Sequence, residues 1–370
     1  MAKFLFWLSV GVVFFTYFGY PALLGIWSWL RPRKVNKAAI LPSVSIVITA
    51  HNGADYFNRK IANLLEQVDY PADKVEVILV SDGSTDGTLE QAQRIADPRF
   101  RLFALPARSG KPTALNLGVK EARGEIVIFN DMRQTMAPSA VRELVANFND
   151  PAVGQVTGEM TLLDENNQFR PQYGIYYRYE HWIRLKESSI NSMIGSAGAF
   201  SAIRRNLFKP LPPEIILDDV YTPMQIAIQG YRTVFDSSAL AYDPHDSRPE
   251  FHRKQRTLTG NYQILFLLPA ILTPRNPLLL SYVCHKVLRL IVPFFMLAAL
   301  GANLFLHSAF YLATLAAQVL FYLIALASPR LRDLPAIGPF AASGSTFVLA
   351  NCAAVMGLFF FLRRKRDLWV

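Results

Sequence analysis

The sequence predicts an α/β domain with a doubly wound, mostly parallel sheet, placed between α-helical membrane segments. Hydrophobic residues make up 52% of the 370 residues, and they gather at the N-terminus and in the last quarter of the chain. This segregation is typical of membrane spans around a soluble domain rather than of one large core. Between the apolar ends, short β-rich runs alternate with helical stretches, and polar residues follow successive runs. Such an order is typical of sheets that bind ligands at the carboxyl edge of their strands.

Four membrane spans are expected. The first apolar run, residues 4–30, is too long for the apolar region of a signal peptide, so residues 1–30 are predicted to be a retained membrane helix. Three more spans are expected within residues 277–362, and a basic tail follows at 363–370. Their approximate positions are 290–306, 309–327 and 337–362.

Basic residues decide the expected orientation. Four of them follow the first span, which places the next domain in the cytoplasm and makes the chain a multi-pass protein of the cell (inner) membrane. His285, Lys286 and Arg289 are expected just before the second span, at the cytoplasmic boundary. Counting four crossings puts both chain ends outside, whereas the basic tail favours the cytoplasm. The first helix usually decides the orientation of the whole chain, so both chain ends are expected outside.

The formal net charge of +10 is concentrated beside the predicted spans, where basic residues set topology and contact anionic membrane lipids. The sequence contains no basic stripe with interleaved aromatic residues, so nucleic acid is not an expected partner. The two cysteines, Cys284 and Cys352, lie in apolar segments and have neither metal-ligand nor disulfide spacing.

The soluble domain is expected over residues 43–236. Strands are predicted at 44–49, 75–80, 101–105 and 125–129, with helices at 58–67, 88–96 and 113–122. Residues 237–276 follow as a segment with a basic patch and a short apolar run, which suits an amphipathic helix in the membrane interface.

Four aspartates are candidates for chemistry. Asp82 ends the second strand, where a carboxylate can accept a hydrogen bond from the imide of a uracil, although a turn and helix cap use the same residue types. Asp131 ends the fourth strand, where beside a diphosphate it would hold Mg²⁺ or Mn²⁺; the alternative is a solvated strand end. One of the adjacent Asp218 and Asp219 can serve as a general base, unless both only begin a helix.

Two cationic motifs suit a diphosphate. Lys111 lies in a short polar loop after the third strand and can supply positive charge to phosphates, or it is an ordinary exposed lysine. Arg253 and Arg256 share one face of a helix and can clamp a diphosphate, although lipid headgroups would attract them equally.

In order and spacing these motifs resemble the inverting family 2 glycosyltransferases, which have the GT-A fold. The flanking spans are similar in layout to the membrane-bound branch that includes cellulose, hyaluronan and chitin-oligosaccharide synthases. The resemblance covers Val44 to about Asn261, and it implies a nucleotide-sugar donor with UDP as the nucleotide, Asp219 as catalytic base and Asp131 as metal ligand. It also implies nucleotide binding by Ala50, His51, Asn52, Asp82, Lys111, Asn116 and Arg256, and acceptor binding by Gly195, Ser196, Ala197 and Asp218.

Some positions depart from the family pattern. Gly53 stands where an acid is common, and Arg133 replaces the second acid of the Asp-x-Asp metal motif, which leaves Asp131 as the one strong metal ligand. Thr257 replaces the tryptophan that processive synthases place beside the acceptor, which argues against polymerisation. Trp182 is close in sequence to the acceptor segment and is the candidate substitute.

The expected activity is transfer of a hexose or N-acetylhexosamine, with inversion, to a lipid-linked saccharide or growing polysaccharide at the cytoplasmic membrane face. Expected partners are the donor, the acceptor, membrane lipids and other polysaccharide-assembly proteins. Two alternatives stay open: a polyprenyl-phosphate monosaccharide transferase, and a catalytically inert nucleotide-sugar-binding regulator of a partner synthase. A transporter is not expected, because the spans lack intramembrane acids and broken-helix pairs.

Overall fold

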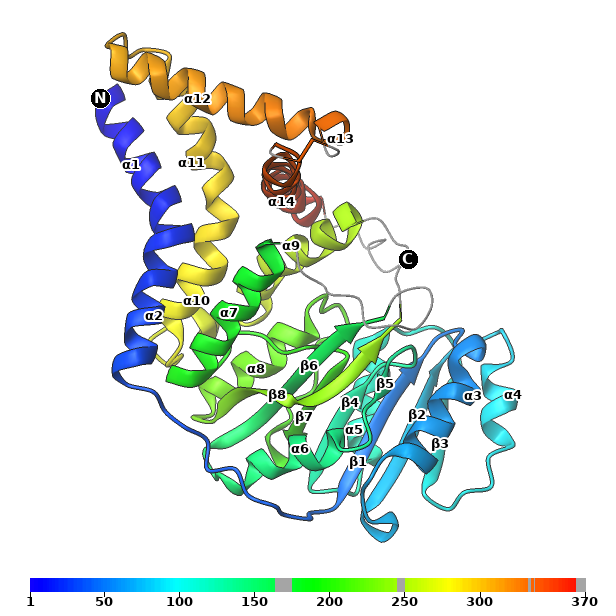
Figure 1. Cartoon of the computed structure of the whole chain (residues 1–370). Coiled ribbons are helices and arrows are strands. Elements are labelled where there is room, and N and C mark those ends of the chain that lie inside the picture. The colour runs from blue at the N-terminus through cyan, green and yellow to red at the C-terminus, as the bar shows by residue number, and fades with distance from the viewer. Residues whose placement is uncertain (164–174, 245–249, 332–333, 336, 364–370) are drawn as a thin grey trace.

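A curled mixed sheet organises the soluble domain (Figure 1). The structure is a computed structural model, and it describes residues 1–163, 175–244, 250–331, 334–335 and 337–363. Within these residues the sheet has eight strands, in the order β3-β2-β1-β4-β7-β6-β8-β5. The four predicted strands are confirmed, and they pair in parallel. They are β1 (Val44–Ala50), β2 (Val75–Asp82), β3 (Phe100–Leu105) and β4 (Ile126–Asn130).

Helices cover both faces of this sheet, which is why its central strands are unbroken apolar runs. Successive side chains of β1 point to opposite faces: Ile46 and Ile48 join one core cluster, and Val47 joins the other. On the second face, a Cβ at Gly118 would meet Val47 Cγ1 at 2.4 Å, so only glycine lets the helix lie this close to the strand. The helices are α3 (Ala54–Ala62), α4 (Thr88–Gln93), α5 (Lys111–Glu121), α6 (Ala140–Ala146) and α8 (Asp218–Ile228).

The second half of the sheet is mixed. It contains β5 (Thr135–Met136), β6 (Val153–Leu162), β7 (Phe200–Arg204) and β8 (Arg232–Asp243). β7 runs antiparallel to both β4 and β6, and no sequence pattern predicts this reversal. Because of it, Phe200 at the start of β7 pairs with Asn130 at the end of β4. The loop before β7 therefore lies at the carboxyl edge of β4, where the parallel strands also end.

Among the described residues, four helices are long and apolar enough to cross a membrane, one N-terminal and three C-terminal, as the sequence predicts. The second begins at Leu279, earlier than expected, so the prediction that His285, Lys286 and Arg289 precede it is wrong. The four are Ala2–Leu30 (α1 and α2 around a π-helical turn), Leu279–Asn303 (α10 and α11), α12 (Ala309–Leu326) and α14 (Gly338–Leu362).

Helix α7 (Ile175–Ile190) explains how these charges lie inside an apolar helix. Glu187 Oε1 lies 2.7 Å from His285 Nδ1, and Glu180 pairs with Arg289. A buried charge that is paired and hydrogen-bonded is tolerated where a lone one is not. The ion pair of Glu180 with Arg289 and the hydrogen bond between Glu187 and His285 therefore attach the soluble domain to its second apolar helix.

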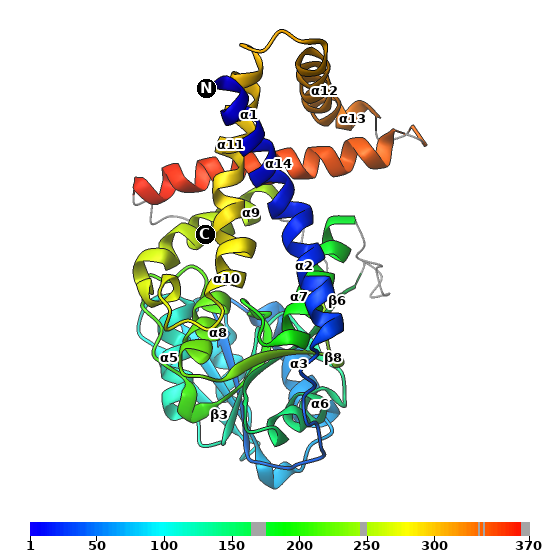
Figure 2. The ribbon, with the colours of Figure 1, turned by 90° about the vertical axis from the view of Figure 1, so that its left-hand side faces the viewer.

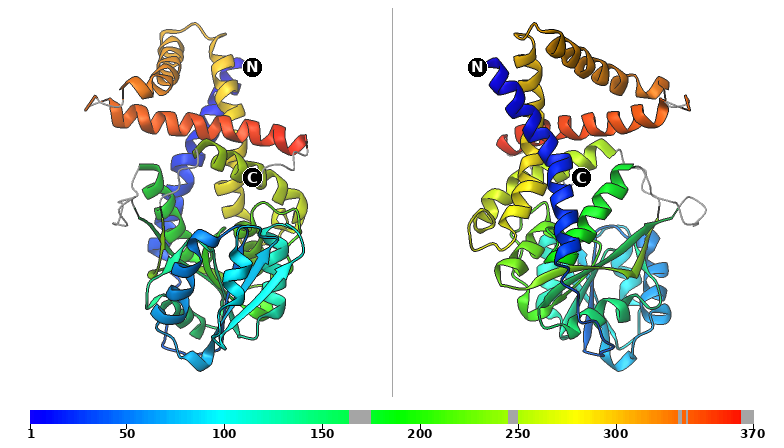
Figure 3. Two further views of the ribbon diagram at one scale, coloured as in Figure 1. Left: turned by 90° about the vertical axis from the view of Figure 1, so that its right-hand side faces the viewer. Right: turned by 60° about the vertical axis from the view of Figure 1, so that its left-hand side comes forward.

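Helix α14 lies across the other membrane helices. α1 and α11 run side by side, and Figures 2 and 3 show α14 crossing them. Its C-terminal turns rest on α9 (Glu250–Leu267), where Phe361 stacks on Phe266 with 5.1 Å between ring centres. In turn, Gln263 of α9 accepts a hydrogen bond from Ile216 N–H of the soluble domain. The described end of α14 is thus on the domain's side of the membrane helices.

A reporter fused after Val370 is expected to lie on the same side of the membrane as one fused after Lys37. The packing of Phe361 on α9 is the reason, and the basic residues of the tail favour the same side. Paired reporters that are active on opposite sides of the membrane measure this; opposite readings at the two fusions would support four full crossings. Arg332 and residues 364–370 of the predicted basic tail lie outside the described residues.

Candidate active site

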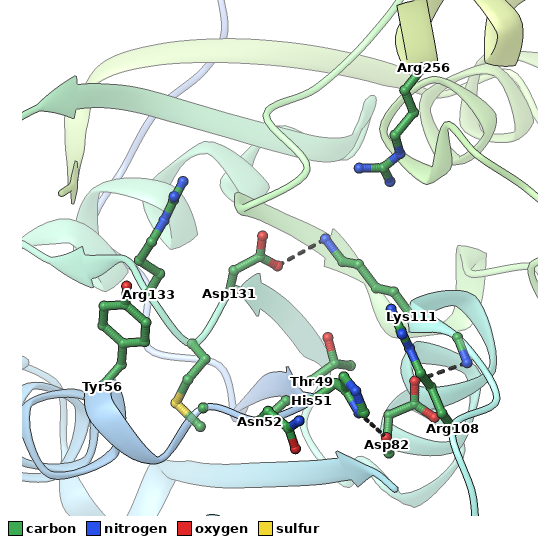
Figure 4. Close-up of a pocket in the computed structure, with 14 residues that line it drawn as sticks. Thr49, His51, Asn52, Tyr56, Asp82, Arg108, Lys111, Asp131, Arg133 and Arg256 are labelled. Carbon is green, nitrogen blue, oxygen red and sulfur yellow. Dashed lines mark hydrogen bonds and ion pairs between the residues drawn. The ribbon is translucent and has the colours of Figure 1, made fainter. Parts of the chain in front are cut away.

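A cavity of about 340 Å³ opens at the carboxyl edge of the parallel strands (Figure 4). Its volume is within the range of small-molecule sites. Strands β1, β2 and β4 all end at this cavity, and one arginine reaches it from α9. Seven of the residues predicted to bind nucleotide or metal line it: Ala50, His51, Asn52, Asp82, Lys111, Asp131 and Arg256.

Asp82 holds the loop that leads into α5. One of its carboxylate oxygens accepts the N–H of Ser109 at 2.6 Å, and the other accepts the N–H of Gly110 at 2.9 Å. The ring of His51 donates from Nδ1 to the backbone carbonyl of Asp82 at 2.8 Å, because a carbonyl can only accept. These bonds fix the position of Lys111, the first residue of α5. A carboxylate keeps further lone pairs for a ligand donor, so the uracil contact of Asp82 stays a prediction.

Lys111 lies between acidic side chains from two parts of the fold. Its Nζ is 2.9 Å from Asp131 Oδ1 at the end of β4 and 3.7 Å from Asp218 Oδ2 at the start of α8. Burial works against the charge of Lys111, but these carboxylates outweigh it and hold its pKa above the usual value. The lysine therefore stays charged and connects the cavity with the aspartate pair.

Asp219 is placed beside the predicted acceptor segment. The backbone carbonyl of Asp219 accepts a hydrogen bond from the N–H of Ser196 at 2.8 Å. A Cβ placed on Gly198 would lie 3.1 Å from the Cβ of Asp219. Gly195 is packed against the same backbone, and the N–H of Ala197 is held by a neighbouring strand. The Oδ1 of Asp219 is buried and accepts no hydrogen bond from the residues that the structure describes. A buried carboxylate with a vacant oxygen is suited to accept a proton.

The electrostatic surroundings tune Asp219 as a base. Burial, and then the negative charge of Asp218, raise the pKa of Asp219 to about 6. The positive charges of Lys286, Lys111 and Arg184 act in the opposite direction. The carboxylate is therefore ionised at neutral pH but binds a proton more readily than an ordinary aspartate.

Residues 45–211 match the family model described as glycosyl transferase family 2. The chain carries a family 2 glycosyltransferase domain. An N-acetylglucosaminyltransferase of Rhizobium leguminosarum bv. viciae is 26% identical over 230 residues, which are 57% of this chain and 53% of that protein. A poly-β-1,6-N-acetyl-D-glucosamine synthase of Staphylococcus aureus is 22% identical over 233 residues, which are 61% of this chain and 56% of the relative. The chain thus spans about half the length of these curated relatives.

The GT-A fold of the glycosyltransferase domain is shared with a solved structure. The mannosyltransferase PcManGT from Pyrobaculum calidifontis, in complex with GDP-Man and Mn²⁺, superposes with a TM-score of 0.75 at 23% identity. The superposition covers 98% of this chain and 99% of that one, so the similarity of fold includes the membrane helices.

Two predicted site residues make contacts that point to other roles. The side chain of Asn116 exchanges two hydrogen bonds of 2.8 Å with the backbone of Leu211, so both of its polar atoms hold a loop. Trp182 packs against α2, where a Cβ at Gly25 would be 3.2 Å from its ring, and the Nζ of Lys186 lies 5.7 Å from its ring centre. Nucleotide binding by Asn116 and acceptor binding by Trp182 have no support from these contacts.

The predicted Mg²⁺ or Mn²⁺ site at Asp131 has little on the protein side to hold the ion. In the described part of the chain no three His, Cys, Asp or Glu side chains form a group that could bind a metal. Asp131 is already paired with Lys111, and Arg133 stands where a second acid is common in the family. The guanidinium of Arg133 instead makes two contacts of 3.0 Å with the carboxylate of Asp243 at the end of β8. These donors do not fit a divalent ion held by the protein.

Sequence reasoning missed Lys60, which is fully buried beneath the turn that carries Asp131. Its Nζ bonds the side chain of Asn130 and, at 2.6 Å, the carbonyl of Gln134, while burial lowers its pKa to about 7. A signal was available, because Lys60 falls at helical spacing between the apolar Phe57 of α3 and Leu64 of the π-helical turn that follows it, and both of these are buried. Arg108 and Tyr56 also line the cavity, and no motif marks either of them.

The acid limb of the pH profile is expected near pH 6. Because the base must be ionised, kcat/KM should fall as the pH drops through the raised pKa of Asp219, about 6. Asp218→Asn removes the like charge that raises this pKa, so the limb should move to lower pH. Steady-state rates from pH 5 to pH 8 measure both profiles. The control is Glu214→Gln, an exposed acid, and an unmoved limb in Asp218→Asn would contradict the assignment.

Proposed function

We propose that this glycosyltransferase moves a hexose or N-acetylhexosamine from a nucleotide diphosphate donor, with UDP as the nucleotide, to a lipid-linked saccharide or growing polysaccharide at the cytoplasmic membrane face. The observation that carries the proposal is the position of Lys111 between the cavity and the aspartate pair: its Nζ is 2.9 Å from Asp131 and 3.7 Å from Asp218. One cation thereby adjoins both the donor cavity and the base.

The proposed reaction is a single displacement. Asp219 takes the proton of an acceptor hydroxyl as the hydroxyl oxygen bonds to the anomeric carbon of the donor sugar. The bond from that carbon to the diphosphate breaks on the opposite side, and the nucleoside diphosphate leaves with the electron pair. Lys111 and Arg256, which both line the cavity, stabilise the developing charge on the leaving group. One displacement inverts the anomeric configuration.

The membrane acceptor is supported by the fold and by the relatives. Helix α9, which supplies Arg256 to the cavity, packs against α14 (Figure 1), so an acceptor anchored in lipid would approach the cavity from the side of these helices. The names of the two curated relatives indicate N-acetylglucosamine transfer and, in one case, synthesis of a polysaccharide.

Asp219→Asn should lower turnover about 10²–10⁴-fold, the usual loss for a general base, and leave donor binding nearly unchanged. The physical reason is that a base acts in the transition state and contributes little to binding the ground state. Release of nucleotide in nanodiscs measures turnover, and calorimetry with UDP measures binding. The matched control is Asp73→Asn, an exposed aspartate at the opposite edge of the sheet. Turnover within a few-fold of the parent would remove Asp219 from the mechanism.

Products are expected to be short, from one or a few transfers. A processive enzyme needs an aromatic face for the acceptor sugar, and Thr257 offers none, since its hydroxyl bonds the carbonyl of Arg253 on its own helix at 3.0 Å. Trp182 does not supply this aromatic face, because its ring packs against α2. The test supplies donor in large excess over a lipid-linked acceptor and sizes the products. Long chains from an enzyme-limited reaction would contradict the expectation.

A further inference from the structure

We propose that the donor's diphosphate is neutralised by arginine and lysine side chains of the cavity instead of by a divalent cation. The inference rests on the proposed function, because it concerns how the same cavity binds the nucleotide diphosphate. It assigns Arg133 as a binding residue that takes the place of a metal.

The first step is the charge of the cavity. Four cationic side chains and two carboxylates line it, and two of the cations also have acidic partners just outside the lining: Lys111 is paired with Asp218 and Arg133 with Asp243. The diphosphate of a nucleotide sugar carries two negative charges, which arginine and lysine side chains at the cavity wall can stabilise directly. The cations are Arg108, Lys111, Arg133 and Arg256, and the acids are Asp82 and Asp131.

The second step is the ion pair that Asp131 already makes. Its Oδ1 is 2.9 Å from the Nζ of Lys111, so a divalent ion on this carboxylate would lie beside a fixed ammonium. The negative charges of Asp131, Asp218 and Asp219 outweigh the effect of burial on the pKa of Lys111 and keep that ammonium charged. Asp131 therefore acts as a positioning residue that holds Lys111 in the cavity.

The third step is the way in which the guanidinium of Arg133 is held in place. Two contacts of 3.0 Å to Asp243 hold its guanidinium by the Nε and one terminal nitrogen. A guanidinium held in this way presents its N–H donors in a fixed plane, a geometry that suits phosphate oxygens. Figure 4 shows Arg133 on one side of Asp131 and Lys111 with Arg256 on the other, so cations flank the place where a motif metal would lie.

Calorimetry of UDP binding to the full chain in nanodiscs tests this. For the wild type, affinity in chelator is expected to equal affinity in Mn²⁺ or Mg²⁺. Arg133→Asp restores the second acid of the Asp-x-Asp motif, so its affinity in chelator should fall roughly 10- to 100-fold, the loss of a charge-assisted contact, and should recover with Mn²⁺. Arg94→Asp, the same charge change on an exposed residue of α4's C-terminus, should bind like the wild type in both buffers.

The outcomes separate the two proposals. Wild-type binding that is lost in chelator and restored by Mn²⁺ or Mg²⁺ overturns the inference and leaves the proposed function standing. Binding of neither UDP nor GDP in any buffer overturns the proposed function. The wild-type comparison needs no variant, and Arg256→Gln gives a second measurement if Arg133→Asp does not fold: its affinity in chelator should fall by a similar factor.

Discussion

The position of one half-buried ammonium group organises the site. Lys111 lies between Asp131 and Asp218, and these carboxylates come from the end of β4 and the start of α8, far apart in sequence. The contact requires that α5 begin at Lys111, which the bonds from Asp82 to the preceding loop ensure. It also requires that the loop before β7 and the start of α8 meet the edge of β4. The antiparallel insertion of β7 satisfies this condition, since it brings Phe200 beside Asn130.

Membrane helices take part in shaping the cavity. Arg256 belongs to α9, and α14 packs on the next turn of that helix so tightly that a Cβ at Gly357 would lie 3.0 Å from the backbone nitrogen of Thr259. On the other side of the domain, Glu180 of α7 pairs with Arg289 and Glu187 bonds His285 within the second of these apolar helices. The domain is thus joined to the apolar helices on two sides, and the packing of α14 on α9 helps to position Arg256 at the cavity.

The sequence predicts the parts of the fold that depend on local pattern. Strands β1 to β4 are continuous apolar runs ended by polar residues, and the membrane helices are long apolar segments, so each has its own signal. The direction of β7 has none, because strand direction depends on which neighbours complete the sheet. The predicted site residues at strand ends are brought together. Asn116 and Trp182 are not among them, because Asn116 bonds the backbone of Leu211 and Trp182 packs against α2. The contact between Arg133 and Asp243 joins residues 110 positions apart, beyond the reach of any local pattern.

Charge links the donor cavity to the base. The positive charge of Lys111 lowers the pKa of Asp219 in the free protein, although burial and Asp218 outweigh it. In the proposed reaction, the diphosphate brings two negative charges to the same ammonium group, so less of its field acts on Asp219 and the proton affinity of the carboxylate increases. A base that strengthens when the donor is bound can remove a proton from an acceptor hydroxyl at the stage when a leaving group is present. A divalent ion bound with the donor would cancel the added charge and with it this coupling. The proposed neutralisation by arginines and a shared lysine would therefore do more than replace a metal, because it would make the strength of the base depend on occupation of the donor site.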